Sequence, residues 1–124
     1  MTQDKDTRKR ILKAALKEFA QNGFGGARME RIAKAAKINK AMIFYYFSSK
    51  EQLHFAVVKE VFQKMAPVFG KLVVSEPSPA VFLEKAAEIY SDLFSKHPNF
   101  VRMVAIELLQ NPKTITSAIQ TFLL

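Results

Sequence analysis

The sequence predicts an all-α protein whose first part contains a helix-turn-helix unit. Along the 124 residues, apolar side chains recur every three or four positions and rarely alternate, which is the period of helices and not of strands. Two short amphipathic segments, residues 29–36 and a second starting at Asn39, are joined by a tight three-residue turn. Positive charge is concentrated in the same part of the chain.

The net charge of +8 comes entirely from residues 1–50. These contain twelve Lys and Arg against four Asp and Glu, whereas residues 51–124 contain seven of each kind. A basic module joined to a neutral one indicates a polyanionic partner such as nucleic acid. A lysine-rich solvated surface is the other explanation of the charge, so the prediction of nucleic-acid binding depends on the helix-turn-helix pattern as well.

The first helix is expected at about residues 7–22, capped by Asp6 or Thr7 and carrying one apolar stripe. Gly23 suits the left-handed position after a helix, and Phe24 can fold back onto Phe19, as in a Schellman stop. Gly25 and Gly26 then predict a turn. A second helix is expected at residues 29–36, where Ala33 and Ala36 allow a close crossing with the third helix.

The third helix has the clearest start. Asn39 is a good N-cap, and Ile38 and Ile43 occupy the two positions of a hydrophobic staple. A capping box, Ser49 to Gln52, starts a long fourth helix that is expected to run to Pro67 or a little beyond.

The second half of the chain predicts three further helices. Residues 70–79, which contain "SEPSP", are expected to form a loop or domain boundary. Ser78 and Pro79 then provide the N-cap and first-turn proline of a fifth helix that stops before His97. A sixth helix is expected from Pro98 to about residue 110, and a seventh begins after Asn111-Pro112 in the final segment "KTITSAIQTFLL". This last pattern ends without a cap, on an apolar run.

A rotation of about 100° per residue divides the third helix into two faces. Ile43 and Phe47 point to the core, while Ala41, Met42 and Tyr45 lie opposite and Phe44 and Tyr46 flank them. In a major groove, Met42 and Ala41 can contact thymine methyl groups, Lys40 can reach guanine or a phosphate, and the tyrosine hydroxyls can donate to phosphates. The backbone amides at the start of the fourth helix, together with Lys50, form a candidate phosphate site.

Several of these residues have a second interpretation. Asn39 is more simply a helix cap than a base reader. The rings of Tyr45 and Tyr46 can pack against the first helix or a partner protein. Lys34 and Lys37 can be merely solvated, and so can the basic residues of the first helix, whereas Arg28, at the start of the second helix, is the better candidate for a phosphate contact.

From about Thr7 to Phe55 the sequence resembles the DNA-binding domain of the TetR (tetracycline repressor-like) family. The resemblance lies in the order of "ILKAALKEFAQNGF" and "IAKAAKINKAMIFYYFSSKEQL". Members of the family similarly have a first helix ending in Gly-Phe or Gly-Tyr, Ile-Ala in the second helix, and a tyrosine-rich third helix followed by Phe, Lys and Glu. The motif then spans residues 29–48, and the family's DNA contacts match Lys40, Ala41, Met42, Phe44, Tyr45, Tyr46 and Lys50.

Some positions depart from the family pattern. The family often has paired threonines where this chain has Ala27-Arg28, which exchanges a hydroxyl cap for a guanidinium. The usual glycine of the turn is Lys37, and the usual glycine and threonine of the third helix are Ala41 and Met42. A frequent tyrosine is Phe44, which has no hydroxyl to donate to a phosphate. These differences affect base preference and not the fold.

The resemblance implies a DNA-binding domain at residues 1–50 and a helical effector-binding and dimerisation domain, here incomplete, at residues 51–124, with the fourth helix (about 50–67) as connector. It further implies a ligand-responsive repressor that binds a palindromic operator on double-stranded DNA as a homodimer, is regulated by a small-molecule effector, and is cytoplasmic and associated with the bacterial nucleoid. The phenylalanine content after residue 55 suits an apolar effector pocket and equally suits a plain core.

Other functional classes find less support in the sequence. There is no cysteine, and the sequence has no Gly-rich phosphate loop, no G-x-S-x-G and no paired acids; His54 and His97 have no ligand partners at helical spacing. We therefore expect no enzyme, metal site or cofactor. No secretion signal precedes the first helix, and charged residues interrupt the apolar window at 55–74, which excludes a membrane span. A basic helical protein that binds a membrane surface or a protein partner is the remaining alternative.

Overall fold

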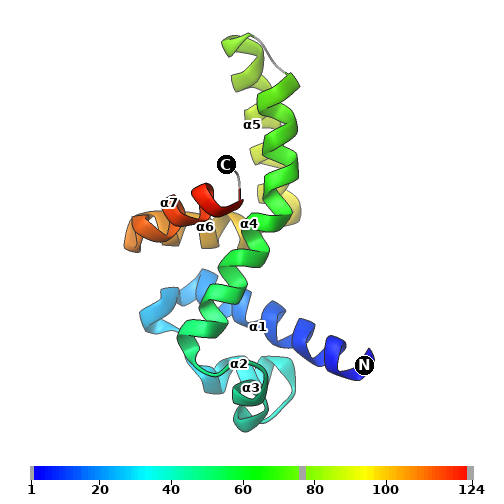
Figure 1. The fold of residues 1–124 in the computed structure, drawn as a ribbon, viewed down its shortest axis with the longest axis vertical. Coiled ribbons are helices and arrows are strands. Elements are labelled where there is room, and N and C mark those ends of the chain that lie inside the picture. Colours follow the sequence, from blue (N-terminus) through cyan, green and yellow to red (C-terminus); the bar gives the residue numbers. More distant parts are fainter. Residues whose placement is uncertain (1, 76–77, 123–124) are drawn as a thin grey trace. The chain divides into compact units, whose positions relative to one another are not determined.

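A computed structural model of the chain describes residues 2–75 and 78–122, and over these residues the fold is all-helical, as predicted (Figure 1). The described helices are α1 (Thr2–Gly26), α2 (Met29–Ala36), α3 (Lys40–Tyr46), α4 (Lys50–Ser75), α5 (Pro79–Lys96), α6 (Pro98–Gln110) and α7 (Pro112–Phe122). The chain forms two compact units, Met1–Val58 and Lys59–Leu124, which divide within α4.

The first helix begins earlier than predicted and ends differently. It starts at Thr2, and the hydroxyl of Thr7 donates to the carbonyl of Gln3 at 2.9 Å, so Thr7 lies inside the helix and is not its cap. Gly23 has the predicted positive φ (70°), but its ψ of 178° makes a kink and not a Schellman stop. The chain resumes helical geometry after this kink as far as Gly26, where a turn was predicted. Phe24 folds back as expected, with its ring stacked 6.2 Å from that of Phe19.

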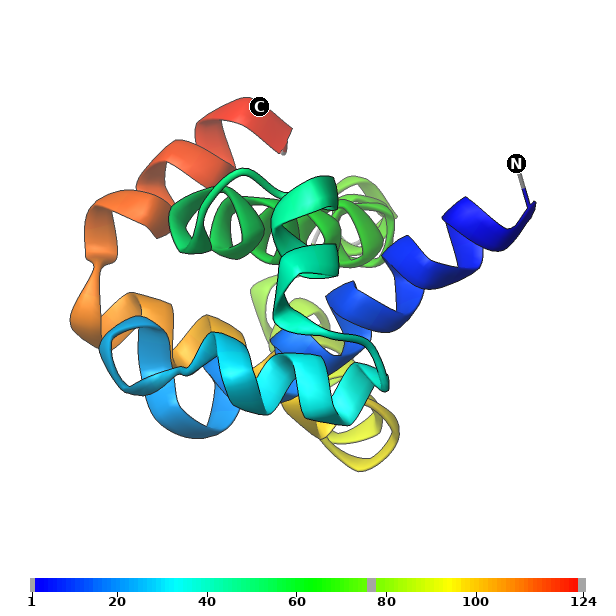
Figure 2. The same ribbon diagram turned by 90° about the horizontal axis from the view of Figure 1, so that it is seen from below.

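The Schellman motif occurs instead at the end of α2. Lys37 has left-handed backbone angles (φ 60°, ψ 45°), which carry a steric penalty for any residue with a Cβ atom. The N–H groups of Lys37 and Ile38 donate to the carbonyls of Lys34 and Ala33 at 3.2 and 3.1 Å. This pair of bonds satisfies the last carbonyls of α2 and turns the chain sharply towards α3. Figure 2 shows the two short helices and the tight connection between them.

Local capping signals set the starts of the next two helices as predicted. The side chain of Asn39 accepts a hydrogen bond from the N–H of Met42 at 2.8 Å and caps α3. The hydroxyl oxygen of Ser49 accepts from the N–H of Gln52 at 3.1 Å and caps α4.

The prediction that α4 would end near Pro67, with a loop over residues 70–79, is wrong for residues 70–75. The helix continues through Pro67 and Gly70 to Ser75. A proline removes one backbone hydrogen bond and a glycine weakens a helix by about 1 kcal/mol, but neither stops a helix when the residues around them favour it. The remainder of the expected loop falls partly on residues 76–77, which lie outside the described part of the chain.

The later helices follow the sequence prediction closely. Pro79 and Pro98 occupy the first turns of α5 and α6, as expected from their missing N–H groups. Ser78 lies at the N-cap position of α5, although its side chain makes no capping hydrogen bond. Within the second unit α6 packs against both α5 and α7, and the ammonium group of Lys64 on α4 lies 5.7 Å from the ring centre of Phe100.

The first unit is built on a continuous apolar core that fixes the helix-turn-helix. Residues from α1, α2, α3 and α4 contribute to it, and the buried side chains include Ile11, Ala15, Phe19, Ile32, Ala36, Ile43, Phe47, Leu53 and Val57. Because α3 is only seven residues long, these contacts and its cap, rather than its own helix propensity, hold it in place.

Candidate nucleic-acid interface

The helix α3 presents the two faces that the sequence predicted. Ile43 is fully buried and Phe47 is 5% exposed, so both anchor the helix to the core. On the opposite side, Ala41 is exposed, and Met42 and Tyr45 are 42% and 79% exposed. An apolar face of this kind is unfavourable in water and is suited to thymine methyl groups and base edges in a major groove.

The two flanking rings differ in their surroundings. Phe44 is 41% exposed, which makes it available to a ligand, but it has no polar group to donate. Tyr46 is half-buried, and its hydroxyl donates to Asp4 of α1 at 2.9 Å. Partial burial and this bond raise the pKa of the Tyr46 phenol. The hydroxyl that was predicted to reach a phosphate is therefore engaged within the protein, and its proton can go to only one acceptor at a time.

Lys40, at the start of α3, is paired with Glu30 on α2. The Lys40 ammonium donates to Glu30 Oε1 at 2.8 Å, and both side chains are exposed. This hydrogen bond, with the attraction of the same ammonium, lowers the pKa of the Glu30 carboxyl. An exposed pair of this kind is weak, so Lys40 remains able to reach DNA.

Arg28 precedes α2, and its side chain is exposed, as a phosphate contact requires. Its own side chain does not cap the helix; instead its backbone N–H donates to the carboxylate of Glu18 on α1 at 3.1 Å. The same Glu18 oxygen accepts from Arg31 Nε at 2.7 Å and from the Asn22 side chain at 3.1 Å. Glu18 thus supplies an acceptor from α1 for the backbone N–H of Arg28, the residue that precedes α2.

The turn between α2 and α3 is held by Arg10 of α1. Its guanidinium donates to the carbonyl of Ala36 from two nitrogens, at 3.1 and 2.6 Å, and to that of Lys37 at 3.3 Å. These carbonyls end α2 and would otherwise lack partners within the helix. Arg10, which the sequence left open as a phosphate contact or a solvated residue, is a structural clamp on the helix-turn-helix.

Contacts with aromatic rings position Lys50 and His54 near the start of α4, where the candidate phosphate site lies. The Lys50 ammonium lies 4.6 Å from the ring centre of Phe24, a cation–π contact that leaves N–H donors available to a ligand. His54, one turn later, packs edge-on against Phe19 and Phe24, with ring centres 4.9 and 5.0 Å apart. His54 is therefore a packing residue.

Glu18, Arg31 and Asp4 were not singled out as functional in the sequence, and the structural role of Arg10 was not predicted. The only local signal for Glu18 is an acid placed between the core residues Ala15 and Phe19. Their contacts with α2, α3 and the turn between them span from 10 positions, between Glu18 and Arg28, to 42, between Asp4 and Tyr46, so helical spacing could not reveal these contacts.

The charge around the helix-turn-helix is strongly positive. From residue 28 to residue 50 there are six Lys and Arg and one acid, Glu30. Lys34, Lys37 and Lys40 are all exposed. This surface can neutralise phosphates on both sides of a groove while the exposed face of α3 meets the bases.

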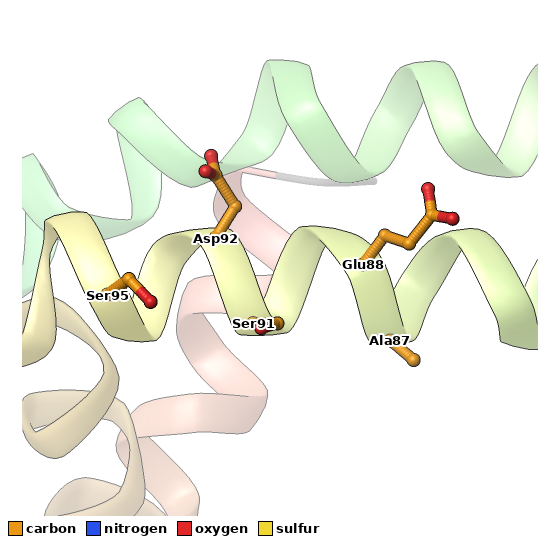
Figure 3. A pocket seen from close by; sticks show the side chains of 5 residues that line it. All are labelled: Ala87, Glu88, Ser91, Asp92 and Ser95. Carbon is orange, nitrogen blue, oxygen red and sulfur yellow. The ribbon is translucent and has the colours of Figure 1, made fainter.

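Among the described residues of the second unit, the hollow along α5 is not comparable with this surface. An open hollow of about 510 Å³ lies along α5 and is lined by Ala87, Glu88, Ser91, Asp92 and Ser95, all exposed (Figure 3). One face of a single helix does not enclose a ligand, and the acids do not suit an apolar effector. In the parts of the chain that the structure describes, no three metal-ligating side chains gather, and no helix is long and apolar enough to cross a membrane.

Comparison with known proteins identifies the first unit. Residues 11–57 match the family model of bacterial regulatory proteins of the tetR family. Residues 11–57 form a tetR-family domain. The matched range begins within α1, contains the whole helix-turn-helix and ends in the first part of α4.

Named relatives extend the likeness into the second unit. The transcriptional repressor NicS of Pseudomonas putida is 39% identical over 101 residues, which cover 82% of this chain and 48% of NicS. The transcriptional regulator RutR of Escherichia coli is 33% identical over 103 residues, with the same two shares. The chain spans about half the length of the curated relatives it matches. A solved TetR-family regulator from Marinobacter aquaeolei has the same fold, with a TM-score of 0.77 at 22% identity over 97% of this chain and 65% of that one.

Proposed function

We propose that this chain carries the DNA-binding part of a ligand-responsive transcriptional repressor that acts as a homodimer on a palindromic operator. The observation that carries the proposal is the exposed apolar face of α3, set in a basic surface and anchored by the buried Ile43. The tetR-family domain at residues 11–57 and the name of the relative NicS, a transcriptional repressor, support it.

The role of each residue follows from groove geometry. With α3 in the major groove, Ala41, Met42 and Tyr45 face base edges, and Lys40 reaches guanine O6 and N7 or a phosphate. Arg28 and Lys50, at the starts of α2 and α4, contact phosphates on the two sides. Phe44 supplies only apolar contact, Asn39 serves as the cap of α3, and Tyr46 contacts DNA only if its bond to Asp4 is exchanged.

The remaining parts of the proposal rest on the family. An effector bound by the helical part of the full-length protein weakens operator binding, and α4, which runs from the helix-turn-helix into the second unit, transmits the change. Such a repressor works without enzymatic activity or a cofactor, in the bacterial cytoplasm at the nucleoid.

The direct test is a titration of the protein against the palindromic DNA upstream of its own gene, with unrelated duplex DNA as competitor. We expect preference for the palindrome and a steep loss of affinity as salt rises, because each neutralised phosphate releases counterions. Equal affinity for both DNAs would contradict the proposal.

A substitution at the phosphate site sharpens the test. Lys50→Ala should weaken binding to all sequences alike and reduce the slope of log affinity against log salt by about 1. Lys59→Ala is the matched control, because the exposed Lys59 lies on the same helix about 13 Å further along its axis. An unchanged slope for Lys50→Ala would remove Lys50 from the interface.

Binding to a membrane surface is the alternative, and liposome co-sedimentation tests it. The basic residues lie on several short helices joined by turns, whereas a membrane-surface helix carries charge along one long polar face. We therefore expect no co-sedimentation with anionic liposomes at salt concentrations that preserve DNA binding.

A further inference from the structure

One acid lies within the basic helix-turn-helix segment. Between residues 28 and 50, Glu30 is the single Asp or Glu among six Lys and Arg. Its side chain is 66% exposed, so no buried partner requires a carboxylate there. On a surface offered to phosphates, this negative charge opposes binding, which raises the question of what it contributes.

Glu30 connects the two helices of the unit through Lys40. The carboxylate lies in the first turn of α2 and accepts from the Lys40 ammonium at the start of α3, at 2.8 Å. An ammonium group has three N–H donors, so Lys40 can keep this bond and still donate to a guanine. The second carboxylate oxygen can accept from the exposed amino group of the cytosine paired with that guanine.

We propose that Glu30 determines sequence specificity, by holding the Lys40 ammonium in one place so that the two side chains read one base pair together. The inference rests on the proposed function and deepens it. Without Glu30, the long side chain of Lys40 can reach several phosphates and bases. The bond to Glu30, although weak as an exposed ion pair, favours one position of the ammonium and so reduces the cost of ordering the side chain on DNA.

A simpler explanation for an acid at this position is local. A carboxylate in the first turn of a helix interacts favourably with the helix dipole, and a surface ion pair can add a small stabilisation. Both effects change stability or overall affinity and leave base preference unaltered. The experiment therefore has to measure preference at each operator position, and not affinity alone.

The experiment selects binding sites from a pool of random-sequence duplex DNA with the wild-type chain, Glu30→Gln, Lys40→Met and the double variant. We expect Lys40→Met to reduce preference at one position of the half-site by about tenfold. Glu30→Gln should reduce preference at the same position, and the double variant should be no worse than Lys40→Met. Thermal unfolding of each variant checks that the fold is retained.

Two further variants separate the explanations. Glu51→Gln removes an equivalent exposed charge from the first turn of α4 and should change affinity without changing preference. The exchange Glu30→Lys with Lys40→Glu restores an ion pair but presents a carboxylate from α3, and it should not restore the wild-type preference.

Three results would overturn the inference. They are a uniform rise in affinity for Glu30→Gln with preference unchanged, a change at a position that Lys40 does not read, or full recovery by the exchanged pair. If the wild-type chain selects no sequence at all, the proposed function fails, and the inference fails with it. If the wild-type chain selects a sequence and Glu30→Gln selects the same one with unaltered preference, only the inference is refuted.

Discussion

The two compact units of this chain differ in how their side chains are used. In the first, polar side chains connect separate helices: Arg10 joins α1 to the end of α2, and Glu18 joins α1 to its start. In the described part of the second, the ion pairs Lys64–Glu60 and Lys96–Asp92 each lie within one helix, and the Lys64 ammonium also contacts the Phe100 ring on α6. Positions in the first unit are thus fixed by bonds between elements, which a groove-reading surface requires.

The same contrast appears in the apolar side chains. Large residues of the first unit fill its core, with Ile43 and Leu53 fully buried. On α5 and α6, by comparison, Leu83, Phe94 and Leu109 are each more than half exposed. We infer that rigidity is concentrated around α3.

The largest effect is expected from matched truncations in the two units. Ile43→Ala removes a fully buried side chain and should lower the free energy of unfolding by about 2–5 kcal/mol, because it leaves a cavity under α3. Leu109→Ala removes an equally large side chain that is 82% exposed, and it should change the free energy of unfolding by about 0.5 kcal/mol or less. Urea unfolding followed by circular dichroism measures both, and similar losses would refute the contrast.

A smaller but still large effect is expected at Glu18. Glu18→Leu leaves the N–H of Arg28 and the Nε–H of Arg31 without their acceptor, and we expect a loss of about 2–3 kcal/mol. Glu51→Leu makes the same substitution at an exposed position of α4 and should cost about 0.5 kcal/mol or less. If the two variants unfold at the same urea concentration, Glu18 does not organise the start of α2.

A gain of stability is expected at Lys37. Because its backbone is left-handed, Lys37→Gly should stabilise the protein by about 1 kcal/mol, since glycine adopts these angles without steric penalty. Lys34→Gly, three residues earlier and inside α2, should have the opposite sign and cost about 1 kcal/mol. Thermal unfolding distinguishes them, and destabilisation by both would show that the conformation of Lys37 is not strained.

The sequence predicted the elements well because their boundaries are local. Asn39 marks a helix start because its side chain can cap the helix, and Pro79 and Pro98 mark starts because the first turn does not need their missing N–H. The structure has helices at these places. Local signals failed where the surroundings outweighed them. Pro67 and Gly70 did not end α4, and the Schellman motif formed at Lys37, where no glycine marks it.

The candidate interface was predictable in part for the same reason. Helical rotation places Ala41, Met42 and Tyr45 on the exposed face, because that depends only on the period of α3. The supporting contacts could not be predicted: Glu18 meets Arg31 across 13 positions, and Tyr46 meets Asp4 across 42. Such contacts depend on how the helices pack, which no spacing within one helix encodes.

The smallest expected effect concerns the bond between Tyr46 and Asp4, which connects α3 to the start of α1. The pKa of Tyr46 is raised in the folded protein above its ordinary value of about 10, so folding favours the protonated phenol. The stabilisation is therefore fully present below about pH 10 and is lost as pH rises through the folded pKa. Tyr46→Phe lacks the phenol and its bond, so wild type should be the more stable at neutral pH and lose that advantage in alkali.

Urea unfolding of wild type and Tyr46→Phe at neutral and alkaline pH measures this difference, and Tyr45→Phe, at the exposed neighbouring ring, is the control. A constant difference across the pH range would show that the phenol does not bond to Asp4 in solution. In that case the hydroxyl is available to a phosphate, and Tyr46→Phe should weaken DNA binding more than Asp4→Asn strengthens it. If the bond is present, Asp4→Asn should strengthen DNA binding, because it removes a negative charge and leaves a neutral acceptor that holds the Tyr46 hydroxyl less strongly.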